Sequence, residues 1–234
     1  MNLRELNVVV TGASRGLGLA LSRRFAAAGA VVVMVARGVV DLEEAVAGVR
    51  EVGEAHALPA DVGAPDAAAQ IAGAAAAMVG PIDVLVHNAS MLGPVPLRPL
   101  AETSDADFDA AFAVNVAGPF RLTRAIVGSM VARERGVVVH VSSDAAVEAY
   151  PTWGAYGASK AAADHLSRVW AAELEGTGVR VLSVDPGEMN TKMHADAIPE
   201  ADPASLRDPN DVAAGIVALI AEGAESGVRV QVAS

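Results

Sequence analysis

The sequence predicts an α/β protein with one doubly wound sheet of seven parallel strands and helices on both faces. Short valine-rich runs, typical of buried strands, alternate along the chain with longer stretches of helical periodicity. A glycine-rich turn follows the first of these runs. The 234 residues show no break in composition, so we expect a single domain over 1–234.

The first strand is expected at 6–11, and it leads into the turn Gly12-Ala-Ser-Arg-Gly16-Leu-Gly18 at the start of a helix. Such a turn directs backbone N–H groups and the positive end of the helix toward a phosphate. Its spacing, Gly-x-x-x-Gly-x-Gly, differs from the dinucleotide fingerprint Gly-x-Gly-x-x-Gly. The combination of strand, turn and helix favours nucleotide binding over the alternative, a tight turn that merely requires glycine.

The second strand, at 29–37, ends in Ala36 and Arg37 and is followed by a helix at 41–52. An acidic residue at this strand end would bind a ribose hydroxyl, whereas a basic residue accommodates a 2′-phosphate. Arg37, together with Arg15 of the glycine turn and with no carboxylate at the strand end, favours NADP(H) over NAD(H). The alternative is that both arginines are ordinary surface residues.

The third and fourth strands are expected at 56–62 and 81–87, with a helix at 65–79 between them. Asp61 is placed either to accept a hydrogen bond from adenine or to cap that helix. After a proline-containing loop, Ser104 begins a capping box and a helix that runs to about 133. Asn115 lies in the middle of this helix, where asparagine is a poor helix former. It either faces a water or a lysine, or is simply exposed.

The fifth strand, at 136–143, ends in Ser142 and Ser143 and is followed by a helix from Tyr156 to 174. Tyr156 and Lys160 are four residues apart, so their side chains share one helix face. The chain has only two tyrosines and two lysines against fifteen arginines. A compact ammonium that reaches a phenol and a sugar hydroxyl cannot be replaced by a planar guanidinium. The pair therefore indicates catalysis rather than two surface neighbours.

The sixth strand is expected at 179–184, before Asp185-Pro186-Gly187. The segment 188–208 combines helix breakers, methionines and mixed charge, which is typical of a mobile lid over a substrate pocket. Asp208 and Pro209 begin the last helix, and a seventh strand is expected at 228–232.

The composition excludes several classes of protein. A net charge of −11 disfavours nucleic acid and anionic membranes as partners. The absence of cysteine excludes disulfides, thiol catalysis and thiolate metal sites, and no histidine spacing indicates a catalytic metal. A strand pattern that begins by residue 6 leaves no room for a signal peptide, and no apolar run is long enough to span a bilayer. We therefore expect a cytoplasmic protein.

Taken together, these motifs resemble the short-chain dehydrogenase/reductase family, which has a Rossmann fold, over nearly the whole chain. The residues that carry the resemblance are Thr11-Gly12-x-x-x-Gly16-x-Gly18, Asn88-Ala89, Asn115, Ser143, Tyr156-x-x-x-Lys160 and Pro186-Gly187-x-x-x-Thr191.

The resemblance implies that Tyr156 is the general acid/base and that Ser143 orients and polarises the substrate carbonyl. Lys160 would bind the nicotinamide ribose, and Asn115 would hold a water in a proton relay. Ser143 is preferred to Ser142 because the family's serine lies thirteen residues before its tyrosine. The residues expected to bind NADP(H) are Gly12, Ser14, Arg15, Gly16, Leu17, Gly18, Arg37, Asp61, Val62, Asn88, Ala89, Tyr156, Lys160, Pro186, Gly187 and Thr191.

The chain departs from the family pattern in two places. His87-Asn88-Ala89-Ser90 stands where Asn-Asn-Ala-Gly is common, so a serine side chain lies near the cofactor ribose. The chain also stops soon after the seventh strand, whereas many relatives have a longer tail. The helices at 105–133 and 154–176 resemble the family's main dimer surface, so a homodimer or homotetramer is expected.

The function that follows is NADPH-dependent reduction of a ketone or aldehyde, or the reverse reaction. A non-catalytic NADP(H)-binding sensor is the alternative, although it would be expected to lack Tyr156, Lys160 or Ser143. A sugar-nucleotide epimerase or dehydratase is disfavoured by the glycine spacing and by the lack of a large C-terminal substrate domain. The low basic charge of the expected substrate pocket favours a small, neutral, largely apolar carbonyl over an acyl group on an acidic carrier protein. Its expected walls are Met91, Leu92, Val95, Asp144, Glu148, Tyr150, Trp153, Met189 and Met193.

Overall fold

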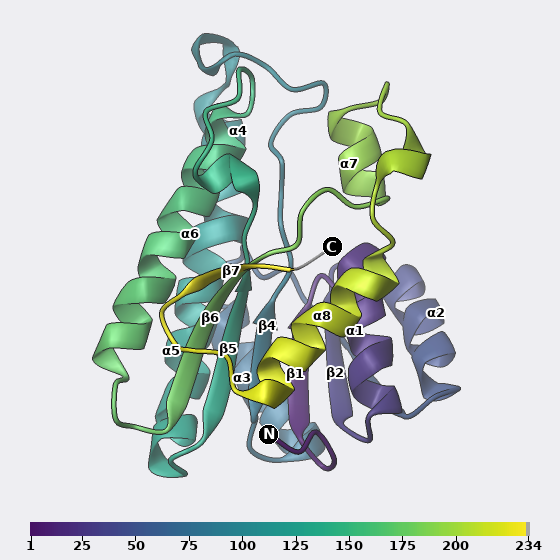
Figure 1. The fold of residues 1–234 in the computed structure, drawn as a ribbon, viewed down its shortest axis with the longest axis vertical. Helices are drawn as coiled ribbons and strands as arrows, with labels where there is room; N and C mark the ends of the chain where they lie inside the picture. The colour runs from purple at the N-terminus through teal and green to yellow at the C-terminus, as the bar shows by residue number, and fades with distance from the viewer. Residues whose placement is uncertain (233–234) are drawn as a thin grey trace.

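The structure is a computed structural model that describes residues 1–232. Seven strands, all parallel, form one sheet in the order β3-β2-β1-β4-β5-β6-β7 (Figure 1). The predicted doubly wound fold class is therefore confirmed. The strands are β1 (Asn7–Thr11), β2 (Val31–Ala36), β3 (Glu54–Pro59), β4 (Val84–His87), β5 (Gly136–Val141), β6 (Val179–Asp185) and β7 (Arg229–Gln231).

The strand order reverses direction between β1 and β4, which lie side by side although two strands separate them in the chain. Val8 of β1 pairs with Val32 on one side and Val84 on the other. A ligand of an open parallel sheet binds at the carboxyl ends of the strands where the order reverses. The fold therefore places the candidate site directly after β1 and β4.

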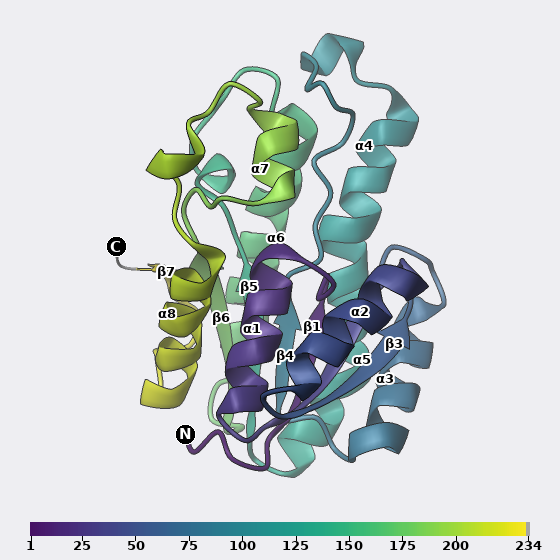
Figure 2. The same cartoon turned by 90° about the vertical axis from the view of Figure 1, so that its right-hand side faces the viewer.

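Helices cover both faces of the sheet (Figures 1 and 2). The helices are α1 (Gly16–Ala27), α2 (Val39–Arg50), α3 (Ala67–Val79), α4 (Asp105–Phe112), α5 (Gly118–Ala132), α6 (Gly154–Glu173), α7 (Lys192–Ala197) and α8 (Pro209–Glu222). Successive strand side chains point to opposite faces. Accordingly, Val8 and Val10 pack in the core under α1, α2 and α8, whereas Val9 packs in the core under α3, α5 and α6.

The helix predicted to run without interruption to about 133 is instead built in two parts. Ser104 is the N-cap of α4 as predicted, since its hydroxyl accepts the Asp107 N–H, but the Asp107 carboxylate accepts from that hydroxyl at 2.7 Å rather than from the Ser104 N–H of a complete capping box. One wide π turn, Ala113–Ala117, then separates α4 from α5. Asn115 lies in this turn with its side chain buried. The helix widens there because a buried asparagine needs partners outside the helix, and π turns are common at functional sites.

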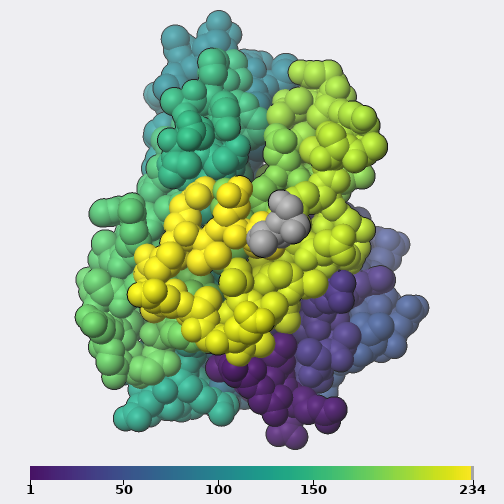
Figure 3. Space-filling model, viewed as in Figure 1, coloured from purple at the N-terminus to yellow at the C-terminus, as the bar shows by residue number. Residues whose placement is uncertain are grey.

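The segment 188–208, predicted as a lid, contains α7 and a short 3-10 turn at Pro203–Ser205. Its two ends meet at its base, where Met189 and Arg207 form a bridge and the Asn190 N–H donates to the Arg207 carbonyl at 2.9 Å. In the space-filling view this yellow-green segment stands on one side of a hollow, opposite the teal part of the chain (Figure 3).

The element boundaries differ modestly from those predicted. The third strand ends at Pro59, so Asp61 and Val62 lie in the turn that follows it rather than in the strand. The last strand pairs over Arg229–Gln231 only. The helix that carries Tyr156 begins at Gly154, as in the predicted range 154–176, and ends at Glu173.

Candidate active site

A cavity of about 720 Å³ opens at the carboxyl ends of the strands and is large enough for a cofactor and a small substrate. All predicted cofactor-binding residues line it except Gly18, and so do Ser143, Tyr156 and Lys160. Gly18 and Asn115 lie behind its wall. Of the expected substrate-pocket residues, Val95 and Glu148 do not line the cavity, and the other seven do.

The glycine turn fits the phosphates of a dinucleotide. Helix α1 begins after Arg15 with no side-chain cap and no acidic residue in its first turn, so its first N–H groups are open to an anion. Gly12 and Gly16 have positive φ angles of 66° and 55°. A Cβ on Gly12 would lie 2.7 Å from the Ala89 Cα, so only glycine fits this approach.

Asn88 holds the glycine turn against the end of β4. Its Nδ2 donates to the carbonyls of Thr11 at 2.9 Å and Gly12 at 3.1 Å. The Thr11 hydroxyl in turn accepts the N–H groups of Asn88 and Ala89, both at 3.1 Å. The two adjacent strand ends are thus joined into one rigid edge of the cavity.

Arg15 and Arg37 are exposed residues that both line the cavity. Neither guanidinium has a hydrogen-bond or ion-pair partner within residues 1–232. The structure also corrects one premise of the cofactor prediction, because Asp41, in the first turn of α2, lines the same region. A carboxylate is therefore present near the predicted phosphate site, although it lies beyond the end of β2.

Asp61 does not cap α3, whose N-terminal cap position is Asp66. Its Oδ1 instead accepts the Gly63 N–H at 2.9 Å and closes a turn. Because Asp61 lines the cavity, adenine binding is the alternative that the structure leaves for it.

Tyr156 and Lys160 project from the same face of α6 toward the cavity and are 7% and 5% exposed. The Lys160 Nζ donates to the Val141 carbonyl at 2.8 Å and lies 5.5 Å from the centre of the Tyr156 ring. Burial lowers the pKa of Lys160 to about 8, against the opposing charge of Asp164. Burial also raises the pKa of Tyr156 to about 12, and hydrogen bonds with Ser143 and Ser90 oppose this rise. The phenol of Tyr156 is therefore protonated at neutral pH.

The two serines after β5 have different surroundings. Ser143 hydrogen-bonds to Tyr156, and its hydroxyl donates to the Asp144 carboxylate at 2.9 Å. Ser142 also lines the cavity, but it is buried and its hydroxyl donates to Asp164 at 2.7 Å. The geometry therefore favours Ser143 over Ser142 as the residue that contacts a substrate.

Asn115 is linked to the loop after β4 and to α6. Its Oδ1 accepts the Met91 N–H, and its Nδ2 donates to the Met91 carbonyl and the Ser159 hydroxyl, all at 2.8 Å. The Ser90 hydroxyl donates to the same Oδ1 at 3.2 Å. Ser90 thus connects Asn115 with Tyr156, a role that its sequence position near the cofactor ribose did not reveal.

Two histidines lie beneath the site on neighbouring strands. His87 and His140 pair across β4 and β5, with ring centres 4.6 Å apart. His87 shares a hydrogen bond of 2.8 Å with Thr123, whereas the His140 Nε2 has no partner in the described part of the chain. Burial, followed by the charge of Lys160, lowers the pKa of His140 to about 3, and burial with His140 lowers the pKa of His87. Both rings are neutral at physiological pH.

Residues 1–232 contain no group of three or more histidines or carboxylates arranged as a metal site. No helix in this range has both the length and the apolar character needed to cross a bilayer.

Comparison with known proteins identifies relatives over most of the chain. The profile of the short chain dehydrogenase family matches residues 6–202. A short chain dehydrogenase from Pseudocercospora fijiensis is 39% identical over 197 residues, which are 82% of this chain and 62% of that relative. The matched segment thus spans less than two thirds of that protein's length.

Two solved structures are similar over nearly their whole length. A metagenomic short-chain oxidoreductase in complex with NADP is 34% identical, with 100% of both chains covered and a TM-score of 0.84. An NAD⁺-bound xylitol dehydrogenase is 26% identical, with 99% of both chains covered and a TM-score of 0.89. Glycine turn, tyrosine–lysine pair, fold and profile agree: this chain belongs to the short-chain dehydrogenases, oxidoreductases that act on small molecules with a nicotinamide cofactor.

Proposed function

We propose that this protein is an NADPH-dependent reductase of a small neutral ketone or aldehyde, or catalyses the reverse oxidation. The observation that carries the proposal is the common cavity of Tyr156, Ser143, Lys160 and the glycine turn. In this proposal the same space holds the dinucleotide and the carbonyl group that Tyr156 protonates.

The bound nicotinamide supplies the hydride. In reduction, the buried phenol of Tyr156 donates its proton to the carbonyl oxygen, a contribution of about 10²- to 10⁴-fold for a positioned acid. Ser143 donates a hydrogen bond to the same oxygen once its hydroxyl turns from Asp144. Lys160 binds the nicotinamide ribose. Asn115 holds the loop at Ser90 and Met91 in place, and it orders a water molecule through which Tyr156 is reprotonated.

The preference for NADPH rests on Arg15 and Arg37, two exposed guanidinium groups that have no partner among residues 1–232. A 2′-phosphate accepts charge-assisted hydrogen bonds from guanidinium groups. Asp41 opposes this attraction, but two positive charges outweigh one negative charge. The remaining proposed cofactor contacts are the open N–H groups of α1, the backbone near Asn88 and the turn from Pro186 to Thr191.

The substrate preference rests on the cavity wall beneath the segment 188–208, which we propose as a lid. Met91, Leu92, Trp153, Met189 and Met193 supply apolar contacts. Asp144 and Glu188 add negative charge to the same wall and would repel carboxylates and phosphates. A neutral carbonyl therefore suits the site best.

The proposal also extends to the assembly as a homodimer or homotetramer. Phe108, Phe120 and Val169 leave apolar surface exposed along α4, α5 and α6. Light scattering after size exclusion would measure the mass directly, and a monomer at micromolar concentration would contradict this part.

Calorimetric titration with NADPH and NADH tests the cofactor preference. We expect NADPH to bind about 10- to 100-fold more tightly, since each charged hydrogen bond contributes about 1.5–3 kcal/mol. Arg37→Gln should remove most of this difference and Asp41→Asn should increase it. Arg50→Gln is the control, because Arg50 donates to the Ala55 carbonyl outside this cavity. Equal binding of both cofactors by the wild-type protein would overturn the preference.

A panel of neutral, carboxylate-bearing and phosphate-bearing carbonyls, assayed with NADPH, tests the activity. Turnover is expected with neutral compounds. Tight NADPH binding without turnover of any carbonyl or alcohol would instead support the sensor alternative. Best activity on an acyl-carrier thioester would contradict the substrate class while leaving the family assignment intact.

A further inference from the structure

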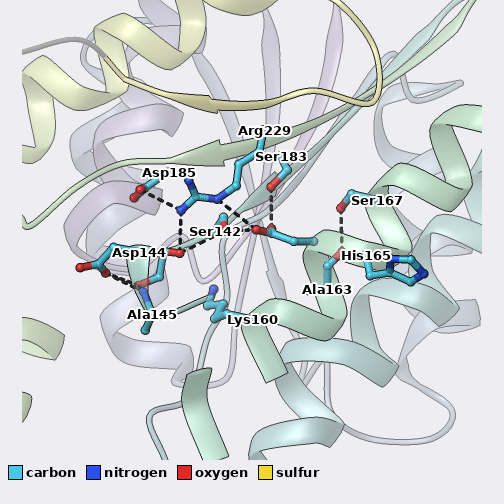
Figure 4. Close-up of polar contacts among 12 residues, drawn as sticks. Ser142, Asp144, Ala145, Lys160, Ala163, His165, Ser167, Ser183, Asp185 and Arg229 are labelled. Atoms are coloured by element: carbon cyan, nitrogen blue, oxygen red, sulfur yellow. Dashed lines mark hydrogen bonds and ion pairs between the residues drawn. The ribbon is translucent and has the colours of Figure 1, made fainter. Parts of the chain in front are cut away.

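A cluster of polar side chains lies directly behind the candidate active site, between β6, β7 and α6 (Figure 4). At its centre is Arg229, the first residue of β7, which pairs with Ser183 of β6. We call this group the Arg229 cluster; its members are Ser142, Asp164, Ser183, Asp185 and Arg229.

The guanidinium of Arg229 contacts three separate parts of the site. Its Nη2 donates to the carbonyl of Ser143 at 2.8 Å and to the Asp185 carboxylate at 2.9 Å. Its Nε donates to the Asp164 carboxylate at 3.2 Å. These acceptors follow β5, end β6 and lie on α6, so one side chain joins three elements that carry functional groups.

Each acceptor is closely connected to a residue of the proposed reaction. The Ser143 carbonyl belongs to the serine that hydrogen-bonds Tyr156. Asp185 uses its other oxygen to accept the Gly187 N–H at 3.0 Å, and thereby holds the turn proposed to contact the cofactor. Asp164 lies one helical turn after Lys160 on α6.

The cluster is also balanced in charge. Asp164 and Asp185 are 7% and 2% exposed, and buried carboxylates are costly without nearby cations. Arg229 and Lys160 together supply the two matching positive charges. Loss of the guanidinium would leave one excess negative charge behind Tyr156.

The charged and titratable groups that face Tyr156 come from every element packed around it. Lys160 of α6, Asp144 after β5 and Asp185 of β6 act on Tyr156 directly. Behind them, Asp164 and His140 act on Lys160, and Arg229 of β7 pairs with Asp164 and Asp185. Arg229 is the cation that neutralises the carboxylates of this group on the β6 and β7 side.

We propose that Arg229 is a positioning residue that fixes Ser143 and the Gly187 turn relative to each other and neutralises Asp164 and Asp185 behind the general acid/base. The inference rests on the proposed function, since it assigns Tyr156, Ser143 and the cofactor turn their roles. It adds a component from the last strand, far from the other functional residues in the chain.

The test compares Arg229→Met and Arg229→Lys with a matched control, Arg180→Met. Arg180 lies on β6 and donates to the carbonyls of Ala224 and Ile220 at 2.9 and 3.0 Å, so it is a structural arginine of the same sheet region. The measurements are the unfolding temperature, the affinity for NADPH, kcat and KM, and the pH profile of alcohol oxidation with NADP⁺.

Arg229→Met should lower kcat about 10- to 100-fold, as expected when reacting groups lose their alignment. It should also move the rising limb of the oxidation profile to higher pH, because the excess negative charge disfavours the phenolate. Arg229→Lys should restore the position of this limb but only part of kcat, since an ammonium lacks the forked geometry. Arg180→Met should lower the unfolding temperature without moving the limb.

The inference is overturned if Arg229→Met loses only stability and keeps the wild-type kcat and pH profile, as Arg180→Met should. If Arg229→Met does not fold, a wild-type pH profile and kcat in Arg229→Lys overturns it equally. If the wild-type protein shows no turnover, the proposed function fails, and NADPH affinity decides the inference separately. Arg229→Met or, failing that, Arg229→Lys should then bind NADPH several-fold more weakly through the Gly187 turn, and unchanged affinity overturns it.

Discussion

The glycine turn and the Arg229 cluster lie at the same edge of the sheet, but their polar groups are in opposite states. At the glycine turn the first N–H groups of α1 have no side-chain cap, and Arg15 and Arg37 extend without partners in the part of the chain described. In the Arg229 cluster, by contrast, every carboxylate oxygen accepts a hydrogen bond, and the guanidinium donates to three acceptors. Open donors mark the place where a ligand completes the structure, whereas satisfied groups build the frame that aligns the reacting residues.

The largest expected effect is a loss of turnover with no loss of cofactor binding. Tyr156→Phe removes only a hydroxyl on the catalytic side, so carbonyl reduction should fall by about 10²- to 10⁴-fold while NADPH affinity stays within a few-fold of wild type. Stopped-flow assays and calorimetric titration on the same preparation measure both. Normal turnover in this variant would exclude Tyr156 as the proton donor.

A change in the glycine turn should produce the converse result. In Gly18→Ala the new Cβ would lie 2.3 Å from the Gly12 carbonyl oxygen and 2.5 Å from the Asn88 Nδ2. The turn must shift, and NADPH affinity should fall about 10- to 100-fold. Gly73→Ala in α3 is the control: its Cβ meets nothing within 4 Å, so it should stabilise the fold by about 0.5–1 kcal/mol and leave NADPH binding unchanged. Equal NADPH affinity in both variants would show that the turn tolerates a side chain.

Acid should destabilise the catalytic side through its buried histidines. The pKa of His140 falls to about 3 on folding, so below about 6.5 the unfolded chain binds more protons than the folded one. Stability from this ring is complete above that pH and is lost as the pH falls, by about 1.4 kcal/mol for each pH unit. Denaturant unfolding measures the free energy of unfolding at each pH between 7 and 4.5. In His140→Gln this free energy should fall less steeply with decreasing pH than in the wild-type protein.

His165→Gln serves as the matched control for the acid series, because His165 is an exposed histidine on α6. The free energy of unfolding of this variant should depend on pH as it does in the wild-type protein. A His140→Gln protein that loses stability with acid as steeply as wild type would mean that other groups govern the acid transition.

The smallest expected effect concerns Ser90, which lies between the two regions. Ser90→Ala removes the hydrogen bonds to Asn115 and Tyr156 and should lower kcat about 2- to 10-fold, as for one hydrogen bond. Because the bond from Ser90 lowers the pKa of Tyr156, its loss should also move the oxidation profile to higher pH. Ser90→Gly should behave like Ser90→Ala if the hydroxyl matters, and a difference between the two variants would indicate that the Cβ shapes the loop instead.

The sequence predicts best those features that depend on neighbours in the chain. The strand–turn–helix around Gly12, the N-cap at Ser104 and the Tyr156–Lys160 spacing are all local, and the structure contains each of them. Asn115 was recognised as unusual, but the wide turn around it depends on Met91 and Ser159, which are 24 and 44 residues away.

The contacts that were not predicted are long-range. Arg229 meets Ser143 across 86 residues, and in sequence it looks like an ordinary polar residue of an edge strand. Asp41 was assigned to a helix, and only the fold brings it to the cavity beside Arg37. The burial of Tyr156 and Lys160 is also a long-range property, since it depends on the packing of several elements and cannot be judged from spacing on one helix.

The wide turn at Ala113–Ala117 has a consequence for how this chain tolerates insertions and deletions. A π turn accommodates one residue more than an α-helical turn of the same rise. Deleting a single residue there would allow a regular α-helix and leave the directions of α4 and α5 nearly unchanged, because the π turn already absorbs the extra residue. The buried Asn115 would instead lose the wide turn from which its side chain reaches Met91 and Ser159. The extra residue at this point therefore serves the contacts of Asn115 rather than the direction of α4.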